Sequence, residues 1–308
     1  MDKKDFLQTG KGVFLSAIFA NFLWGSASSC IKLGYKLFQI ASEDVMSQLL
    51  FAGIRFTFAG VFTILFRSLV THRLPVPGKG SAGMLVTLAL TQTIIQYSLN
   101  YMGLANAPGF KGSVIGASSA FFAVLISALL FRMERLTARK ILGCLIGFLG
   151  VVAIHLHKAG QDAGFRWNGE GFLLVGSISY ALSSVLLKTF SSREDPVTLS
   201  GYQFVLGGLV LLAIGAIRGG SLKPTTPAAW LLLLYLMCVT AVAYTIWALL
   251  LERHPVSRIT VFSFFNPVFG VFLSALILGE GKQLHWGFCL LSLLLVSIGI
   301  WIVNRKKT

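Results

Sequence analysis

The apolar stretches of this sequence contain almost no acidic residues. Charged residues make up only 12% of the 308 positions, and all eleven Asp and Glu residues lie near the ends of apolar stretches or between them. Small proton-driven exporters of drug cations usually depend on a buried carboxylate that binds the proton and the substrate in turn. Without such a residue in mid-span, that mechanism is not expected here.

Catalytic and metal-binding constellations are also lacking. The five histidines lie near the ends of apolar stretches, without carboxylate partners at helical spacing, and no Ser/His/Asp pattern is present. Each cysteine sits inside an apolar stretch with no CxxC spacing and no neighbouring histidine, so neither a disulfide framework nor a zinc site is supported. We therefore predict a protein that is not an enzyme and has no metal and no cofactor.

Long apolar stretches dominate the chain. Hydrophobic residues account for 55% of it, the mean hydropathy is +0.78, and stretches of roughly 20 residues, the length that crosses a bilayer as a helix, recur throughout. These features predict an all-α integral membrane protein with ten transmembrane helices. The expected spans are Gly12–Ile31, Val45–Phe66, Ser81–Leu104, Gly112–Phe131, Ile141–Leu156, Gly171–Leu187, Val197–Ile217, Ala228–Leu251, Ile259–Leu278 and Leu284–Asn304.

An internal repeat divides these spans into two halves. Residues 96–131 align without a gap on residues 243–278 at a shift of 147 positions. The matched pairs include Tyr97 with Tyr244, Pro108 with Pro255, and Lys111 with Arg258. Because each half has five spans, an odd number, the second half must enter the membrane from the opposite side, which predicts inverted repeats.

The domain limits follow from the repeat and from the polar connectors. We expect a cytoplasmic N-terminal segment (1–11), a first repeat (12–156), a linker (157–169), a second repeat (170–304) and a basic tail (305–308). The net charge of +15 is scattered through short connectors, so it is interpreted as a topology signal and not as nucleic-acid binding. Most Lys and Arg residues fall on the side of the two termini, which places both termini in the cytoplasm and the protein in the plasma (inner) membrane.

A stripe of aromatic and polar residues predicts the substrate site. The spacing of Asn21, Trp24 and Ser28 is repeated in Ser177, Tyr180 and Ser184. Polar groups are costly in hydrocarbon unless they have partners, so these faces should point into the bundle or a wet cavity; the alternative is that small polar residues only join helices. The candidate substrate-binding residues are Asn21, Trp24, Ser28, Gln96, Tyr97, Asn100, Ser118, Phe122, Tyr180, Ser184, Tyr244, Trp247, Phe265 and Asn266.

A second set of residues is predicted to have structural or gating roles. Lys32 lies near the end of its span, where it either extends to the interface or pairs with an anionic substrate. Arg55 lies deeper, and we expect it to tie helices together by hydrogen bonds. Pro267 should bend its helix, and Glu134 and Glu280 should serve as helix-end anchors or gate partners for basic neighbours.

Several of these residues carry a family resemblance. Arg55-Phe56, Pro267-Val268, Glu134-Arg135-Leu136-Thr137 and Glu280 resemble the EamA repeat, which occurs twice in the ten-span members of the drug/metabolite transporter superfamily. The resemblance implies cytoplasmic termini, a central cavity between the halves and export of amino acids or other small metabolites. One departure is that Ser119-Ala120 stands where the second half has Asn266-Pro267, so the halves are expected to contribute unequally to gating.

The sequence therefore predicts a secondary transporter working by alternating access through a central aromatic and polar cavity. Amino acids or related small metabolites are the expected cargo, moved outward. The alternatives are another cargo (a nucleotide sugar, a phosphorylated metabolite or a drug-like amphiphile), a membrane enzyme, and a lipid-handling or structural membrane protein. The expected partners are a small-molecule substrate and the lipid bilayer, with no nucleic acid and no obligate protein partner.

Overall fold

The computed structural model describes residues 6–133, 135–153, 165–254, 259, 262–263, 265–282 and 285–304. Within these ranges the chain is helical, with turns and loops between the helices and no strand. The helices of the first half are η1 (Phe6–Gln8), α1 (Gly10–Leu37), α2 (Val45–Thr71), α3 (Ala82–Leu88), η2 (Ala89–Gln96), α4 (Tyr97–Asn106), α5 (Gly109–Ala117), α6 (Ser119–Leu129) and α7 (Ala138–Ala153). Those of the second half are η3 (Trp167–Gly171), α8 (Phe172–Phe190), α9 (Pro196–Ile217), α10 (Ala228–Arg253), α12 (Phe265–Ile277), η5 (Glu280–Lys282) and α13 (Trp286–Asn304).

These helices form the ten predicted spans. Eight helical stretches are long and apolar enough to cross a membrane, among them the continuous run α3–η2–α4 and the pair α5–α6. The shorter helix α7 lies at the position of the fifth predicted span, and the shorter apolar helix α12 lies at that of the ninth. The prediction of an all-α membrane protein built from two five-helix repeats is thus confirmed, with helix ends that differ from the expected ones by a few residues.

Side-chain caps set where several helices begin. The Thr9 hydroxyl accepts the backbone N–H of Gly12 at 3.0 Å at the start of α1. At the start of α9, the Asp195 carboxylate accepts the N–H of Thr198 at 2.8 Å. These side chains satisfy donors that the first helical turn leaves without partners, which fixes the helix ends in the polar connectors.

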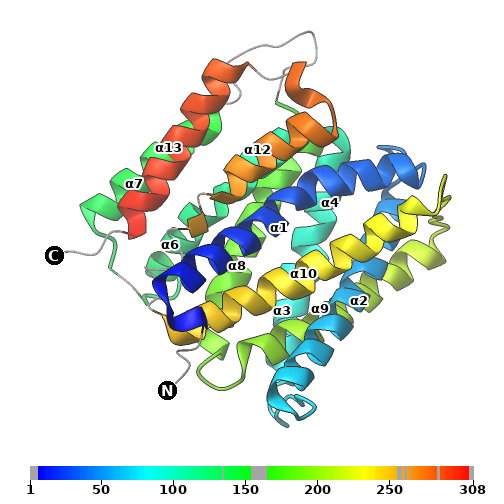
Figure 1. The fold of residues 1–308 in the computed structure, drawn as a ribbon, viewed down its shortest axis with the longest axis horizontal. Coiled ribbons are helices and arrows are strands. Elements are labelled where there is room, and N and C mark those ends of the chain that lie inside the picture. The colour runs from blue at the N-terminus through cyan, green and yellow to red at the C-terminus, as the bar shows by residue number, and fades with distance from the viewer. Residues whose placement is uncertain are drawn as a thin grey trace.

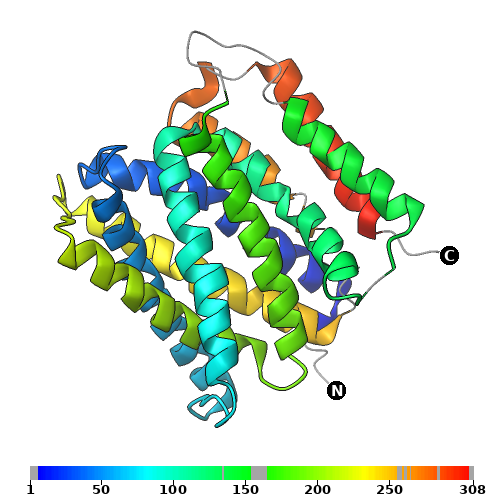
Figure 2. The same ribbon diagram turned by 180° about the vertical axis from the view of Figure 1, so that it is seen from behind.

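The two halves pack against each other with exchanged partners (Figures 1 and 2). Helix α1 of the first half packs on α10 and α12 of the second, while its counterpart α8 packs on η2, α4 and α6 of the first. The equivalent helices α2 and α9 pack on each other, as do α7 and α13, which lie to one side of the bundle. The start of α1 and the end of α13 lie toward the same end of the bundle.

In both fourth spans an α-helix begins within one residue of the same place in the repeat. In the first half, Ser118 separates α5 from α6. In the second half, α12 begins at Phe265, the equivalent of Ser118, after a short 3-10 segment at residues 262–263. Pro267 therefore lies in the first turn of α12, where a proline costs no backbone hydrogen bond, and not in the middle of a bent helix.

The third spans, by contrast, differ between the halves. In the first half, residues Ala89–Gln96 form a π-helix between two α-helical segments, whereas α10 is α-helical throughout. π-helical turns inside helices are rare and occur frequently at functional sites. The turns here carry three buried polar residues, Gln92, Thr93 and Gln96.

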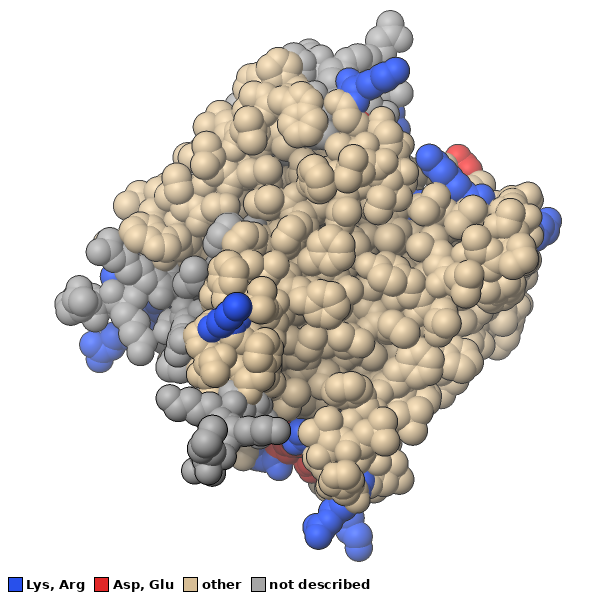
Figure 3. All heavy atoms as spheres, in the orientation of Figure 1, with Lys and Arg blue, Asp and Glu red and all other residues tan. Residues whose placement is uncertain are grey.

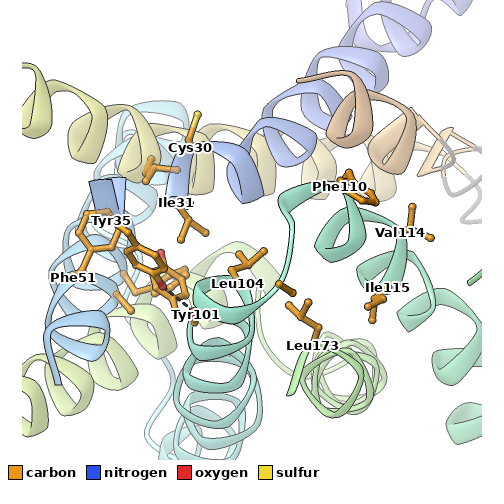
Figure 4. Close-up of a cluster of buried hydrophobic side chains, with 14 of the residues drawn as sticks. Cys30, Ile31, Tyr35, Phe51, Tyr101, Leu104, Phe110, Val114, Ile115 and Leu173 are labelled. Atoms are coloured by element: carbon orange, nitrogen blue, oxygen red, sulfur yellow. Dashed lines mark hydrogen bonds between the residues drawn. The ribbon is translucent and has the colours of Figure 1, made fainter. Parts of the chain in front are cut away.

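The surface and the core of the bundle are both apolar. Large hydrophobic side chains such as Phe58, Leu231 and Trp301 are exposed, and Figure 3 shows an uncharged face with Lys and Arg gathered at its edges. Inside, Tyr35, Phe51 and Tyr101 point toward one another (Figure 4), and the Tyr35 hydroxyl donates to the Tyr101 carbonyl at 2.8 Å. An apolar exterior of this kind requires a lipid environment.

Candidate functional site

Three tyrosines from both halves meet in the middle of the bundle. The hydroxyl oxygens of Tyr97 (α4) and Tyr244 (α10) lie 3.5 Å apart, and Tyr180 (α8) lies close enough to Tyr244 for the two side chains to affect each other electrostatically. Each tyrosine lies near the midpoint of its span and is half-buried. We call Tyr97, Tyr180 and Tyr244 the tyrosine cluster.

Aromatic rings surround this cluster on two sides. Trp24 of α1 makes edge contacts with Tyr244 and Trp247, with ring centroids 5.5 and 5.2 Å apart. On the other side, Phe56 of α2 stacks on Tyr97 at 3.8 Å. Aromatic pairs in such geometries add to the energy of apolar burial. The sequence-predicted residues Trp24, Tyr97, Tyr180, Tyr244 and Trp247 are therefore brought together in one place.

Two glutamines that sequence reasoning had not selected extend the polar part of the site. Gln92 Nε2 donates to the Tyr244 hydroxyl at 2.7 Å, and Gln203 Nε2 donates to Gln92 Oε1 at 3.3 Å. The Thr93 hydroxyl donates to Gln203 Oε1 at 2.5 Å. Both glutamines are buried inside apolar spans. A buried amide needs hydrogen-bond partners, so a glutamine in the middle of an apolar span could have been selected from the sequence as a candidate site residue.

Asn21 and Gln96, both predicted to bind substrate, have buried acceptor atoms without a described partner. Asn21 Nδ2 donates to the Ala17 carbonyl at 2.8 Å, which leaves its Oδ1 without a hydrogen bond within the described structure. Gln96 Oε1 likewise has none. Because buried acceptors without donors are rare, both atoms are suited to accept hydrogen bonds from a bound molecule or from water.

Arg55 lies next to this site and is buried. Its Nε donates to the Leu236 carbonyl at 3.2 Å, Nη1 to the Tyr101 hydroxyl at 2.7 Å, and Nη2 to Thr240 Oγ1 at 3.0 Å. The guanidinium carbon is 4.9 Å from the ring centroid of Phe56. These contacts join α2 to α4 and α10, which is the geometry expected for a residue that ties helices together.

The other predicted substrate-binding residues are not in contact with the tyrosine cluster through any described polar or ring contact. Ser184 is the exception, since its hydroxyl donates to the backbone carbonyl of Tyr180 at 2.8 Å, while the Ser118 hydroxyl donates to the Ile115 carbonyl at 2.6 Å. Phe122 packs on Phe148, and Phe265 on Phe269. Ser28, Asn100 and Asn266 are half-buried on α1, α4 and α12.

Lys32 and Glu280 link the two halves at one end of the bundle. Lys32 Nζ lies 3.3 Å from Glu280 Oε1 and donates to the Ala107 carbonyl at 2.7 Å. Glu280 also accepts the N–H of Gly109 at 2.9 Å and the hydroxyl of Ser274. Lys32 thus has a partner within the protein, and Glu280 has the basic neighbour expected of a gate or anchor residue.

A second ion pair at this end had not been identified from the sequence. Lys111 Nζ lies 2.7 Å from Glu170 Oε1, and both side chains are buried, at 9% and 2% exposure. The sequence had placed Lys111 in a connector, but α5 begins at Gly109, so Lys111 lies in the first helical turn. The pair joins the fourth span of the first half to the first span of the second.

Polar contacts also link the halves at the opposite end. Arg67 Nη2 lies 2.9 Å from Asp195 Oδ1, and the Glu194 carboxylate accepts hydrogen bonds from the Gly78 N–H and the Ser81 hydroxyl. Glu134, the remaining gate candidate, lies outside the described residues. No group of His, Cys, Asp or Glu residues suited to a metal ion occurs in the described part of the chain.

Both repeats of the chain match a known family. The model of the EamA-like transporter family matches residues 11–156 and again residues 167–305. The chain belongs to the EamA-like transporter family. It is thus a multi-pass membrane transporter, and the sequence resemblance to the EamA repeat is confirmed.

Curated relatives match this family member over most of its length. The uncharacterized transporter sll0355 of Synechocystis sp. is 26% identical, covering 95% of this chain and 90% of that protein. The uncharacterized inner membrane transporter YedA of Escherichia coli is 25% identical over 94% and 92%. A solved crystal structure shares the fold with a TM-score of 0.61 at 18% identity, covering 93% of this chain and 96% of the other.

Proposed function

We propose that this family member is a secondary transporter that exports amino acids or related small metabolites by alternating access. The observation that carries the proposal is the tyrosine cluster, in which partly accessible tyrosines from both halves come together at mid-span. Sites near the bilayer midplane at the interface of inverted repeats are typical of secondary transporters. Rings with polar groups suit a small molecule that is part apolar and part polar.

The polar contacts at the two ends fit the same mechanism. Lys32–Glu280 joins the halves at one end and Arg67–Asp195 at the other. In alternating access, the polar contacts at one end must break while those at the other end stay formed. This opens the tyrosine cluster to each side of the membrane in turn. We infer that Lys32 and Glu280 act as gate residues and do not carry protons.

The orientation is part of the proposal. We infer that both termini lie in the cytoplasm of a plasma (inner) membrane, since most basic connectors share their side. The E. coli relative is named an inner membrane transporter. A reporter fused to the C-terminus that is active only in the periplasm should stay inactive, and its activity would reverse the orientation.

Counterflow in proteoliposomes tests the transport function. Vesicles preloaded with pools of unlabelled amino acids should accumulate a labelled amino acid of the same pool, and Tyr244→Phe or Trp247→Ala should lower the initial rate about tenfold or more, since each removes a direct contact of the cluster. Matched controls are Tyr202→Phe and Trp286→Ala, which change the same residue types away from the cluster. An absence of counterflow with every pool, from protein that is folded and inserted, would contradict the proposal.

A further inference from the structure

We propose that Arg55 binds the carboxylate of the transported molecule and that the apolar body of this molecule extends from Arg55 toward Trp24 and Trp247. The inference rests on the proposed transport function and narrows its cargo to organic acids and amino acids. Organic cations without a carboxylate are excluded.

The charge of Arg55 is buried without a counter-charge in the described structure. The side chain is only 4% exposed and carries a positively charged guanidinium group. Arg55 takes no part in the ion pairs Lys32–Glu280, Arg67–Asp195 and Lys111–Glu170. An uncompensated charge inside an apolar bundle is costly, and an anion that binds beside it relieves this cost.

The guanidinium group also keeps hydrogen-bond donors for such an anion. Of its five N–H groups, Nε–H, one on Nη1 and one on Nη2 are bonded to Leu236, Tyr101 and Thr240. One N–H remains on each Nη atom. The bonds that tie the helices therefore leave two donors for a carboxylate, and charge-assisted bonds of this kind are strong.

Arg55 lies one aromatic ring away from the tyrosine cluster. Its guanidinium carbon is 4.9 Å from the Phe56 ring centroid, and that ring stacks on Tyr97 at 3.8 Å. Arg55 also contributes to the electrostatic environment of the Tyr97 hydroxyl. The positive charge thus acts on the place where the proposed cargo binds.

The spacing of residues along helix α10 indicates how long the cargo is. Arg55 bonds to Thr240, and Tyr244 and Trp247 follow one and two helical turns later on the same face. Seven residues of α-helix span about 10 Å. A carboxylate at Arg55 therefore places an apolar or aromatic body of about this length beside Tyr244 and the edge-to-face pair Trp24–Trp247. The rings contact the body of the cargo, while the charge of the cargo lies at Arg55.

Matched pairs of acids and amines test the inference on the unchanged protein. The probes are 3-phenylpropionate with phenethylamine, and 4-methylpentanoate with 3-methylbutylamine, each measured as a competitor of amino-acid counterflow and by quenching of tryptophan fluorescence. Within each pair the acid should bind at least about tenfold more tightly than the amine. Equal or tighter binding of the amines, with transport intact, would overturn the inference while leaving the proposed function standing.

Replacement of Arg55 tests the assignment to this residue. Arg55→Gln introduces the residue that the repeat has at Gln203 and should weaken binding of the acids about tenfold or more while leaving the amines unchanged or improved. Arg55→Lys should keep the preference for acids, and Arg218→Gln, at an exposed helix end, is the matched charge control. An unchanged acid-to-amine ratio in a folded Arg55→Gln protein would overturn the assignment. A lack of both counterflow and binding for every compound would instead contradict the proposed function itself.

Discussion

Arg55 donates a hydrogen bond to Thr240 across 3.0 Å, and this bond joins the second span of one half to the third span of the other. In the second spans Arg55-Phe56 matches Gln203-Phe204 at a shift of 148, and in the third spans Thr93 matches Thr240 at the shift of 147. Thr93 donates to Gln203 across 2.5 Å, so the same bridge is formed again with a neutral amide. The two halves therefore share one architecture but place a single positive charge on one side of the site.

The difference between the two bridges should be measurable as stability. Thr240→Val removes a charge-assisted hydrogen bond and should lower the free energy of unfolding by about 1.5–3 kcal/mol, whereas Thr93→Val removes a neutral one and should cost about 0.5–1.5 kcal/mol. Thermal unfolding in detergent would measure both. Thr245→Val, at a buried threonine that bonds only to the Ala241 carbonyl of its own helix, is the control and should change little.

Much of the fold could be predicted from the sequence because the backbone N–H and C=O groups of a segment in lipid must be hydrogen-bonded within the protein. Apolar stretches of span length must be helical, and five spans per half impose inversion. The matched tyrosines Tyr97 and Tyr244 were predicted to line one cavity because polar groups in apolar spans should face the interior of the bundle, and their hydroxyls lie 3.5 Å apart.

The partners of the polar residues could not be predicted. Lys32 could have reached the interface or bound an anion, and only the packing of α1 against the second half shows its pairing with Glu280. Gln92 contacts Tyr244 because the third span of the first half has a π-helical segment, which shifts the direction of side chains in a way that no spacing rule anticipates. Such contacts depend on tertiary packing, which the pattern of residue types does not specify.

Lys32 and Glu280 should be energetically coupled. Lys32→Met and Glu280→Gln each remove one member of a pair whose side chains are 21% and 8% exposed. The double replacement should lower the free energy of unfolding by less than the sum of the two single replacements, and the difference, the coupling energy, should be about 1 kcal/mol. The gate role adds an expectation for kinetics, because each single replacement should change the counterflow rate. Additive effects on both stability and rate would show that the pair is not a functional link between the halves.

The ion pairs at the two ends should differ in their response to salt. Lys111→Met leaves the buried Glu170 charge without its partner and should lower the free energy of unfolding by about 3–5 kcal/mol. Adding Glu170→Gln to the same chain should restore most of this loss. This cost should not vary between 0.05 and about 1 M salt, because buried pairs are poorly screened.

Arg67 and Asp195, with side chains 18% and 31% exposed, form the comparison. Arg67→Met should lower the free energy of unfolding by about 1 kcal/mol or less, and this loss should become smaller as salt is added. Thermal unfolding at several salt concentrations measures both pairs. The same salt dependence for the two pairs would contradict the burial assigned to Lys111.

Glycine residues at the contact between α7 and α13 allow the two helix backbones to pack closely. A Cβ atom on Gly299 would lie 2.7 Å from the Gly143 carbonyl oxygen and 2.8 Å from backbone atoms of Gly147, and backbone cannot move aside as a flexible side chain can. Gly299→Ala should therefore lower the free energy of unfolding by about 1–3 kcal/mol through overpacking. Gly83→Ala in α3, where a Cβ meets nothing within 4 Å, should instead be neutral or stabilising by up to about 1 kcal/mol. Thermal unfolding of both variants in detergent checks the pair, and a Gly299→Ala protein as stable as Gly83→Ala would show that the two helices can separate without loss.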